Sequence, residues 1–223
     1  MPVQLPSVSG VRFTIARMMN ARIVNARGVP GTLGSLARTL HDGRLVLLTS
    51  HHVLFGAGAR SRQPVRLAHG PAIGRARHGR LGTVPYDGAA IHVDCAVASI
   101  DEAWLPDEAT RGDEALVARV VPGQRVTKTG GATGTTAGVV VDVAYSAPAL
   151  IDGRIGPAPA QILVRADRRG VPFCAPGDSG AVLRDADGAI VGLLWGVAPR
   201  GDGVASPIAP VLHVLHARPV SLR

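Results

Sequence analysis

Short apolar runs, each closed by a turn signal, most constrain how this chain can fold. The runs are rich in Val, Leu and Ile and end at Gly, Pro or Asp-Gly. The 223 residues include 28 glycines and 17 prolines, so the chain must turn often and leaves little room for long helices. This pattern predicts an all-β protein.

Turn signals also predict two β-hairpins. Asp42-Gly43 and Asp187-Gly188 each separate two apolar runs, and Asp-Gly is a preferred hairpin dipeptide. The expected strands share a high content of β-branched and other apolar residues and cover residues 31–40, 44–49, 64–67, 82–84, 95–100, 115–121, 125–129, 138–145, 161–165, 181–183 and 189–197.

The end of the chain has a different pattern, which predicts one short amphipathic helix. Ser206 is a suitable N-cap and Pro207 suits the first helical position. Apolar residues then recur at helical spacing at Ile208, Val211, Leu212 and Leu215.

The formal net charge of +8 comes from 24 Lys and Arg residues against 16 Asp and Glu residues. Lys128 is the single lysine, and the arginines are scattered along the chain. Nucleic-acid surfaces usually cluster basic residues beside stacking aromatics, whereas aromatic residues are only 3% here. This argues against a nucleic-acid partner, and we expect the densest basic stretch, 75–80, to be a solvated loop.

Cysteine content and hydropathy limit the remaining classes. Cys95 and Cys174 are too few for a disulfide framework or a zinc site, so we expect free buried thiols and no metal or cofactor. Residues 1–20 contain no apolar run of signal-peptide length, and no run of about 20 apolar residues could span a bilayer. We therefore expect a cytoplasmic protein, or a secreted one whose leader has been removed, and no membrane partner.

Three chemically competent side chains lie next to apolar runs. His52 follows one run, Asp94 directly precedes another, and Ser179 lies in the sequence Gly177-Asp178-Ser179-Gly180. Glycines permit the sharp turn that exposes a serine hydroxyl and brings two backbone N–H groups together. Taken alone, a histidine, an aspartate or a serine indicates no particular function. Their order along the chain does.

The order His, Asp, Ser in an all-β chain resembles the catalytic triad of the trypsin-like (chymotrypsin-fold) serine proteases, bacterial type without disulfides. Other stretches are similar to the same family and extend the resemblance over roughly residues 30 to 217: Gly31-Thr32-Leu33-Gly34, the Gly- and Thr-rich segment 128–138, Gly192-Leu193-Leu194-Trp195-Gly196, and Gly203-Val204.

The resemblance implies an all-β fold of two Greek-key six-stranded β-barrels with a short C-terminal helix. The expected organisation is an N-terminal extension at 1–28, a first barrel at 29–105 with His52 and Asp94, and an interdomain linker at 106–115. A second barrel with Ser179 would follow at 116–205, and a C-terminal helix and tail at 206–223. The charged, proline-containing stretch after Ile100 suits a linker.

The resemblance also implies a serine endopeptidase that acts on a protein or peptide substrate. Ser179 would be the nucleophile, His52 the general base and Asp94 the residue that orients His52, while the N–H groups of Gly177 and Ser179 would form the oxyanion hole. His52 matches better than His51, because the family's base directly precedes a small apolar residue, here Val53. His51 would be a surface or packing side chain.

The resemblance assigns a substrate pocket as well. Phe173 would lie at its base, with the wall and entrance formed by Cys174, Ala175, Pro176, Leu194, Trp195, Gly196 and Gly203. Because Phe173 is not acidic, we expect a small or apolar P1 residue. Leu194 stands where the family often has a serine that supports the aspartate, so Asp94 should be supported in another way.

Other readings stay open at this point. Arg22-Ile23-Val24-Asn25 resembles a zymogen cleavage site whose new N-terminus would pair with Asp178, but the chain between Ile23 and His52 looks too short for that path. A catalytically idle protease-fold module that binds or scaffolds a partner is the second functional hypothesis. Nucleic-acid binding through the basic surface is the third, and the sequence predicts no oligomeric state.

Overall fold

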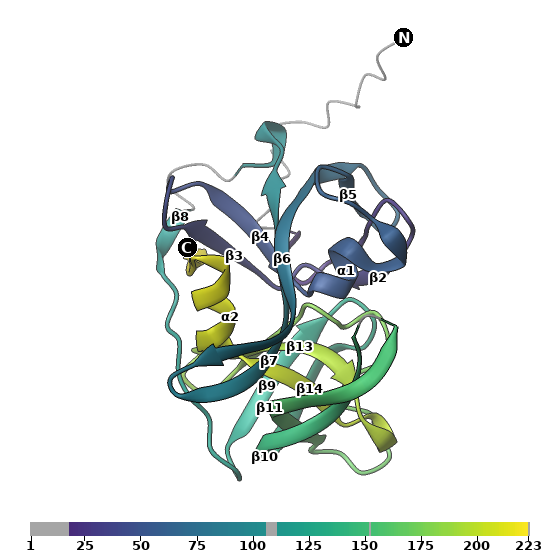
Figure 1. Cartoon of the computed structure of the whole chain (residues 1–223), viewed down its shortest axis with the longest axis vertical. Helices are drawn as coiled ribbons and strands as arrows, with labels where there is room; N and C mark the ends of the chain where they lie inside the picture. Colours follow the sequence, from purple (N-terminus) through teal and green to yellow (C-terminus); the bar gives the residue numbers. More distant parts are fainter. Residues whose placement is uncertain (1–17, 106–110, 152, 223) are drawn as a thin grey trace.

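The computed structural model describes residues 18–105, 111–151 and 153–222, which form two β-sheets (Figure 1). In these residues the α-helices are α1 (His51–Phe55) and α2 (Ile208–Leu215), and short 3-10 turns occur at η2 (Gly56–Gly58), η3 (Glu102–Trp104) and η5 (Pro199–Gly201). None of the helices described is long and apolar enough to cross a bilayer.

The first sheet has nine strands in the order β2-β1-β5-β6-β7-β4-β3-β15-β8. Their bounds are β1 (Arg22–Val24), β2 (Pro30–Thr32), β3 (Ser35–Thr39), β4 (Leu45–Thr49), β5 (Pro64–Leu67), β6 (Ala72–Tyr86), β7 (Ala89–Ile100), β8 (Arg111–Glu114) and β15 (Ala217–Leu222). Only Leu33 and Gly34 separate β2 from β3, so these two are halves of one bent strand. The sheet therefore returns on itself as a six-stranded barrel, to which β15 and β8 are added.

The second sheet is a closed barrel in the order β10-β11-β14-β13-β12-β9. Its strands are β9 (Arg125–Gly130), β10 (Gly134–Ile151), β11 (Arg154–Ala166), β12 (Val182–Arg184), β13 (Ile190–Val197) and β14 (Gly203–Pro207). The expected fold of two β-barrels with a short helix near the C-terminus is confirmed.

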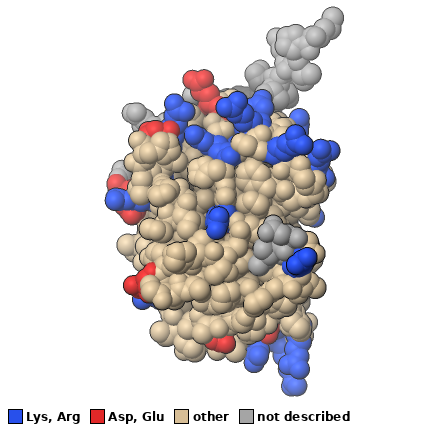
Figure 2. Space-filling model, viewed as in Figure 1, with Lys and Arg blue, Asp and Glu red and all other residues tan. Residues whose placement is uncertain are grey.

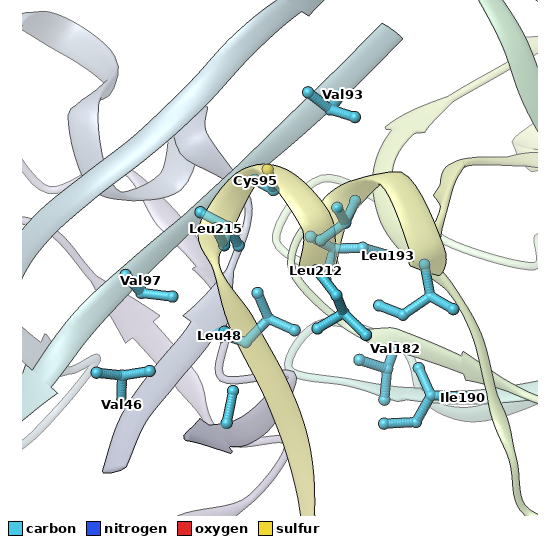
Figure 3. Close-up of a cluster of buried hydrophobic side chains, with 14 of the residues drawn as sticks. Val46, Leu48, Val93, Cys95, Val97, Val182, Ile190, Leu193, Leu212 and Leu215 are labelled. Carbon is cyan, nitrogen blue, oxygen red and sulfur yellow. The ribbon is translucent and has the colours of Figure 1, made fainter. Parts of the chain in front are cut away.

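A shared apolar core joins the two barrels, with α2 packed over it (Figure 3). Leu48 and Val97 come from the first barrel, Ile190 and Leu193 from the second, and Leu215 from α2. All five side chains are buried. Cys95 and Cys174 are free and buried, so burial of apolar surface, not a disulfide, holds the halves together.

The structure differs from the expected domain boundaries at three places. β1 lies within the expected N-terminal extension and pairs with β2 and β5. β8 lies within the expected linker, and β15 within the expected C-terminal tail, where it pairs with β3 and β8. The backbone N–H and C=O groups of each of these segments pair with a neighbouring strand. Because the segments are short, their sequences alone did not predict this pairing.

The predicted helix start is wrong by one residue. Ser206 lies in β14, where it pairs with Leu193 and its hydroxyl donates to the His92 carbonyl at 3.2 Å. Pro207 has extended backbone angles and becomes the N-cap, so α2 begins at Ile208. The cross-strand partners of Ser206 outweigh its local preference for a cap.

Two other expectations are wrong. Residues 75–80 belong to β6 and pair with β7, with Arg75 and Arg80 exposed and Ala76 buried. This alternation suits a half-buried strand. Residues 115–121 form no strand, and their one β-bridge joins Val117 to Ile190. The segment crosses between the sheets and meets its neighbours only at Pro219 and Ile190, which is too short a contact for a strand.

Candidate active site

His52 lies in α1, directly after β4, and is held by Asp94 in β7. Its Nδ1 lies 2.6 Å from Asp94 Oδ2, and its backbone N–H donates to Asp94 Oδ1 at 3.1 Å. Two contacts to one carboxylate fix both the orientation of the imidazole and its tautomer. With the proton on Nδ1, Nε2 is left as the free acceptor.

Electrostatics favour the charged pair. Burial lowers the pKa of His52, but the charge of Asp94 and its hydrogen bond outweigh burial, so the pKa is raised above its usual value. Burial raises the pKa of Asp94, but the His52 charge and two hydrogen bonds outweigh it, so that pKa is lowered. Asp94 therefore stays ionised and stabilises an imidazolium at His52.

Ser179 lies in a turn that only glycines permit on either side. Gly177 has φ +105° and Gly180 has φ +96°, a region that disfavours residues with a Cβ. The Ser179 hydroxyl donates to the Trp195 carbonyl at 3.2 Å. Among the hydrogen bonds of the described residues none joins it to His52.

The contacts between the barrels bring the His52 and Ser179 segments to one junction. The N–H of Thr32 donates to the Ser179 carbonyl at 2.7 Å, and Ser50 Oγ, two residues before His52, donates to the Leu194 carbonyl at 3.0 Å. A Cβ on Gly34 would lie 1.8 Å from the Gly180 carbonyl oxygen. The backbones meet so closely that glycine is required there.

Two backbone N–H groups are available beside Ser179. Within the described part of the chain, neither the Gly177 nor the Ser179 N–H donates to a protein acceptor, whereas the N–H groups of Asp178 and Gly180 do. Such a pair can bind the oxyanion that forms during acyl transfer. These are the two N–H groups assigned to the oxyanion hole from the sequence.

A buried ion pair anchors this turn, and the sequence reasoning missed its cation. Lys128 Nζ lies 3.1 Å from Asp178 Oδ2, and neither side chain is exposed. Asp178 also accepts hydrogen bonds from the N–H groups of Ala132, Thr133 and Ala175 and from the Thr133 hydroxyl. Burial raises its pKa, but these hydrogen bonds outweigh it and lower the pKa below its usual value.

In the zymogen-like hypothesis, a new N-terminus at Ile23 would pair with Asp178, but in the structure Lys128 pairs with Asp178. Ile23 itself is fully buried in β1, where it pairs with Gly31 and Leu67.

Lys128 had a sequence signal that could have identified it. It is the single lysine of an arginine-rich chain and begins a Gly- and Thr-rich segment.

The expected pocket residues lie around β13 and the segment before Ser179. The Phe173 ring is fully buried and fills the space against Gly138 and Gly203. Cys174 Sγ lies 3.7 Å from the Gly196 carbonyl oxygen, and burial raises the pKa of its thiol to about 12, so it is no nucleophile. Of the rest, Leu194 is buried, Ala175, Trp195 and Gly196 are half-buried, and Pro176 is exposed.

Gln161 is a further residue that the sequence did not indicate. Its Oε1 accepts from Trp195 Nε1 at 2.6 Å, and its Nε2 donates to the His92 carbonyl at 2.8 Å. It thereby links β13, which follows Ser179, to β7, which carries Asp94. No signal distinguished this glutamine, because the role depends on contacts between distant strands.

The second histidine has a packing role in this arrangement. The ring of His51 lies 4.9 Å from that of Phe55, and the residue is half-buried. No group of three or more His, Cys, Asp or Glu side chains suited to a metal occurs in the described residues. The chemistry that the geometry offers is therefore that of an oriented imidazole, a serine hydroxyl and two free N–H groups.

No protein-family model and no curated protein matches this sequence. Solved structures do. A glutamic acid-specific serine protease, which uses a histidine triad in substrate binding, matches with a TM-score of 0.63 at 17% identity, over 90% of this chain and 98% of that one. Thermobifida fusca protease A matches with a TM-score of 0.62 at 15% identity, over 92% and 98%.

A chymotrypsin from Cellulomonas bogoriensis matches with a TM-score of 0.59 at 18% identity, over 92% of this chain and 98% of that one. At such low identities these similarities concern the fold. The chain has the two-barrel fold of the chymotrypsin-like bacterial serine proteases along nearly its whole length.

Proposed function

We propose that this chain, which has the chymotrypsin-like fold, is a serine endopeptidase that cleaves peptide bonds with Ser179, His52 and Asp94. The observation that carries the proposal is the 2.6 Å contact from His52 Nδ1 to a buried, ionised Asp94. This contact leaves Nε2 free to accept a proton at the junction that also holds the Ser179 turn. A serine hydroxyl is a weak nucleophile and needs such a base.

In the proposed reaction Ser179 Oγ attacks the carbonyl carbon of the scissile bond while His52 Nε2 takes the hydroxyl proton. The N–H groups of Gly177 and Ser179 bind the oxyanion, each worth about 3 kcal/mol in comparable sites. His52 then donates its proton to the leaving amine, and the acyl group remains as an ester on Ser179. Water, deprotonated by His52, hydrolyses this ester and restores the hydroxyl.

We further propose a small or apolar P1 residue. None of the residues assigned to the pocket is acidic, and Phe173 fills the space between Gly138 and Gly203 at the expected base. A basic P1 side chain would find no buried counter-charge there, and burying an unpaired charge is costly. Strong cleavage after Lys or Arg would contradict this specificity while leaving the protease reaction intact.

The second candidate function is a catalytically idle binding module of the same fold. One observation favours it: the Ser179 hydroxyl donates to the Trp195 carbonyl, not to His52. Catalytic hydrogen bonds are often incomplete before substrate binds, so this contact alone does not outweigh the His52–Asp94 geometry.

The experiment that tests the proposal is incubation of the purified chain with a mixed peptide library, followed by mass spectrometry of the cleavage sites. Wild type should cut within peptides, with small or apolar residues before the scissile bond, and Ser179→Ala should cut none. Absence of cleavage by wild type under all conditions, together with retained peptide binding, would favour the idle module.

A further inference from the structure

An arginine that has no ion-pair partner among the described residues lies against the turn proposed to hold the oxyanion. Arg22 is the first residue of β1 and is exposed. A methyl group placed on Gly177 would lie 3.7 Å from a guanidinium nitrogen of Arg22, and one placed on Gly131 would lie 2.7 Å from Arg22 Cβ. The stem of Arg22 thus rests on Gly131, and its cationic end rests beside Gly177.

The backbone of Arg22 is fixed relative to Ser179. Arg22 pairs with Thr32 between β1 and β2. Thr32 in turn donates its N–H to the Ser179 carbonyl at 2.7 Å and its hydroxyl to the Gly177 carbonyl at 2.9 Å. The backbone of Arg22 is therefore fixed next to the reaction centre, and its surface guanidinium lies beside Gly177.

No acidic group of the described residues neutralises this cation. Other exposed arginines do have carboxylate partners, such as Arg119 with Asp87 and Arg218 with Glu114. Arg22 has no ion pair or side-chain hydrogen bond in the described part of the chain. A guanidinium that presents several donors and lacks a partner can bind a carboxylate from outside.

The position of Arg22 indicates which part of a substrate it would meet. The Ser179 hydroxyl donates to the carbonyl of Trp195 in β13. The pairing of β13 with β12 ends at Leu193, so the edge of β13 that faced β12 is not covered by β12 at Trp195. The acyl half of a peptide can pair with this edge as an added strand. Arg22 lies beyond Gly177, on β1 of the other barrel. A peptide that crosses Ser179 from β13 leaves over this side.

We propose that Arg22 is a specificity-determining residue that favours Asp or Glu in the first two residues after the scissile bond. The inference rests on the proposed peptidase function and names a preference of its leaving-group side. Because the pair would form at an exposed site, we expect an effect of about fivefold in kcat/KM, which high salt should reduce.

The test uses paired quenched-fluorescent peptides that share one acyl half and differ only by Glu or Gln, first at P1′ and then at P2′. Wild type should cleave at least one Glu peptide about fivefold faster than its Gln partner. Arg22→Ala and Arg22→Gln should bring this ratio close to one, and Arg22→Glu should invert it. Arg27→Ala, at another exposed arginine of the same N-terminal segment, should leave the ratio as in wild type.

A p-nitrophenyl ester of the same acyl half separates this inference from the proposed function, because it has no residue after the scissile bond. Arg22 variants should still hydrolyse it, because Ser179 and His52 are intact. If wild type hydrolyses the ester but cleaves the Glu and Gln peptides at equal rates at both P1′ and P2′, the role of Arg22 is wrong and the peptidase function stands. If wild type hydrolyses neither the ester nor the peptides, the proposed peptidase function is wrong, and this inference is wrong with it.

Discussion

Lys128 Nζ lies 3.1 Å from Asp178 Oδ2, with both side chains fully buried directly beside Ser179. Asp178 is held from one side by Lys128 and from the other by the 132–133 turn and Ala175. Its side chain is thus fixed by groups of the second barrel, and through the Ala175 N–H it holds the backbone that leads into Ser179.

Removing the cation should cost much of the stability of the fold. Lys128→Met leaves Asp178 buried without its counter-charge, which typically costs about 3–5 kcal/mol. We expect a corresponding fall in the free energy of unfolding, measured by urea denaturation.

The matched double variant is Lys128→Met with Asp178→Asn, which removes both charges. It should be more stable than Lys128→Met alone, because no unpaired charge remains. Equal stability of the single and double variants would contradict the role of this pair.

Close contact of the barrels at Gly34 predicts sensitivity to a single methyl group. A Cβ at this residue would lie 1.8 Å from the Gly180 carbonyl oxygen, so Gly34→Ala must push the Ser179 turn away from the first barrel. A displacement of about 1 Å can cost on the order of a hundredfold in rate, and we expect such a loss in kcat/KM. Gly156→Ala, where a Cβ meets nothing within 4 Å, is the control and should keep wild-type activity.

The orientation of His52 depends on Asp94. Asp94→Asn keeps the shape of the side chain but replaces an oxygen that accepts the Nδ1 proton, so the imidazole can take the wrong tautomer. The expected result is a fall in kcat of about 10⁴, the size of effect seen in the triad of related enzymes. A loss of less than tenfold in steady-state kinetics would argue that Asp94 does not orient the base.

The pH dependence should follow His52. Its pKa lies above the usual 6.5, and activity requires the neutral imidazole. The value of kcat/KM should therefore rise with pH through a midpoint above about 6.5. Asp94→Asn removes the charge that raises the pKa, so the residual activity should show a lower midpoint; an unchanged midpoint would contradict the assignment.

His92 predicts an acid sensitivity of stability. The residue is fully buried, and neither ring nitrogen has a partner among the residues that the structure describes. Burial outweighs the nearby Asp94 charge and lowers the pKa of His92 below 6.5. The unfolded chain then binds this proton more readily, so the free energy of unfolding falls as pH drops below about 6.5. Urea denaturation at pH 7.5 and 5.0 should show a smaller loss for His92→Phe than for wild type, while His69→Gln should behave as wild type.

Local signals predicted much of the fold. Turn dipeptides and apolar runs indicated an all-β chain and most strands, including β5 with its exact bounds of Pro64–Leu67. They failed where a partner strand decides the structure. Ser206 joins β14, and the 75–80 segment joins β6, because cross-strand hydrogen bonds outweigh local preference.

The candidate site also contains residues that local sequence patterns predicted and residues that they did not. His52, Asp94 and the Ser179 turn could be named because each has a local pattern of glycines or flanking apolar residues. Gln161 and Arg22 have no such pattern, and Lys128 stands out only as the single lysine of the chain. The roles of Lys128 and Gln161 depend on residues far away in the chain, Asp178 and Trp195. Only the packing of the two barrels brings these groups together.

Labelling with a fluorophosphonate probe, read by mass spectrometry of the intact chain and its peptides, tests the central claim most directly. Such probes react with a serine hydroxyl that a neighbouring base activates. Wild type should gain one probe, attached to Ser179, while Ser179→Ala and His52→Ala should gain none and His51→Ala should still react. An unlabelled wild type, or a probe found on another residue, would contradict the account.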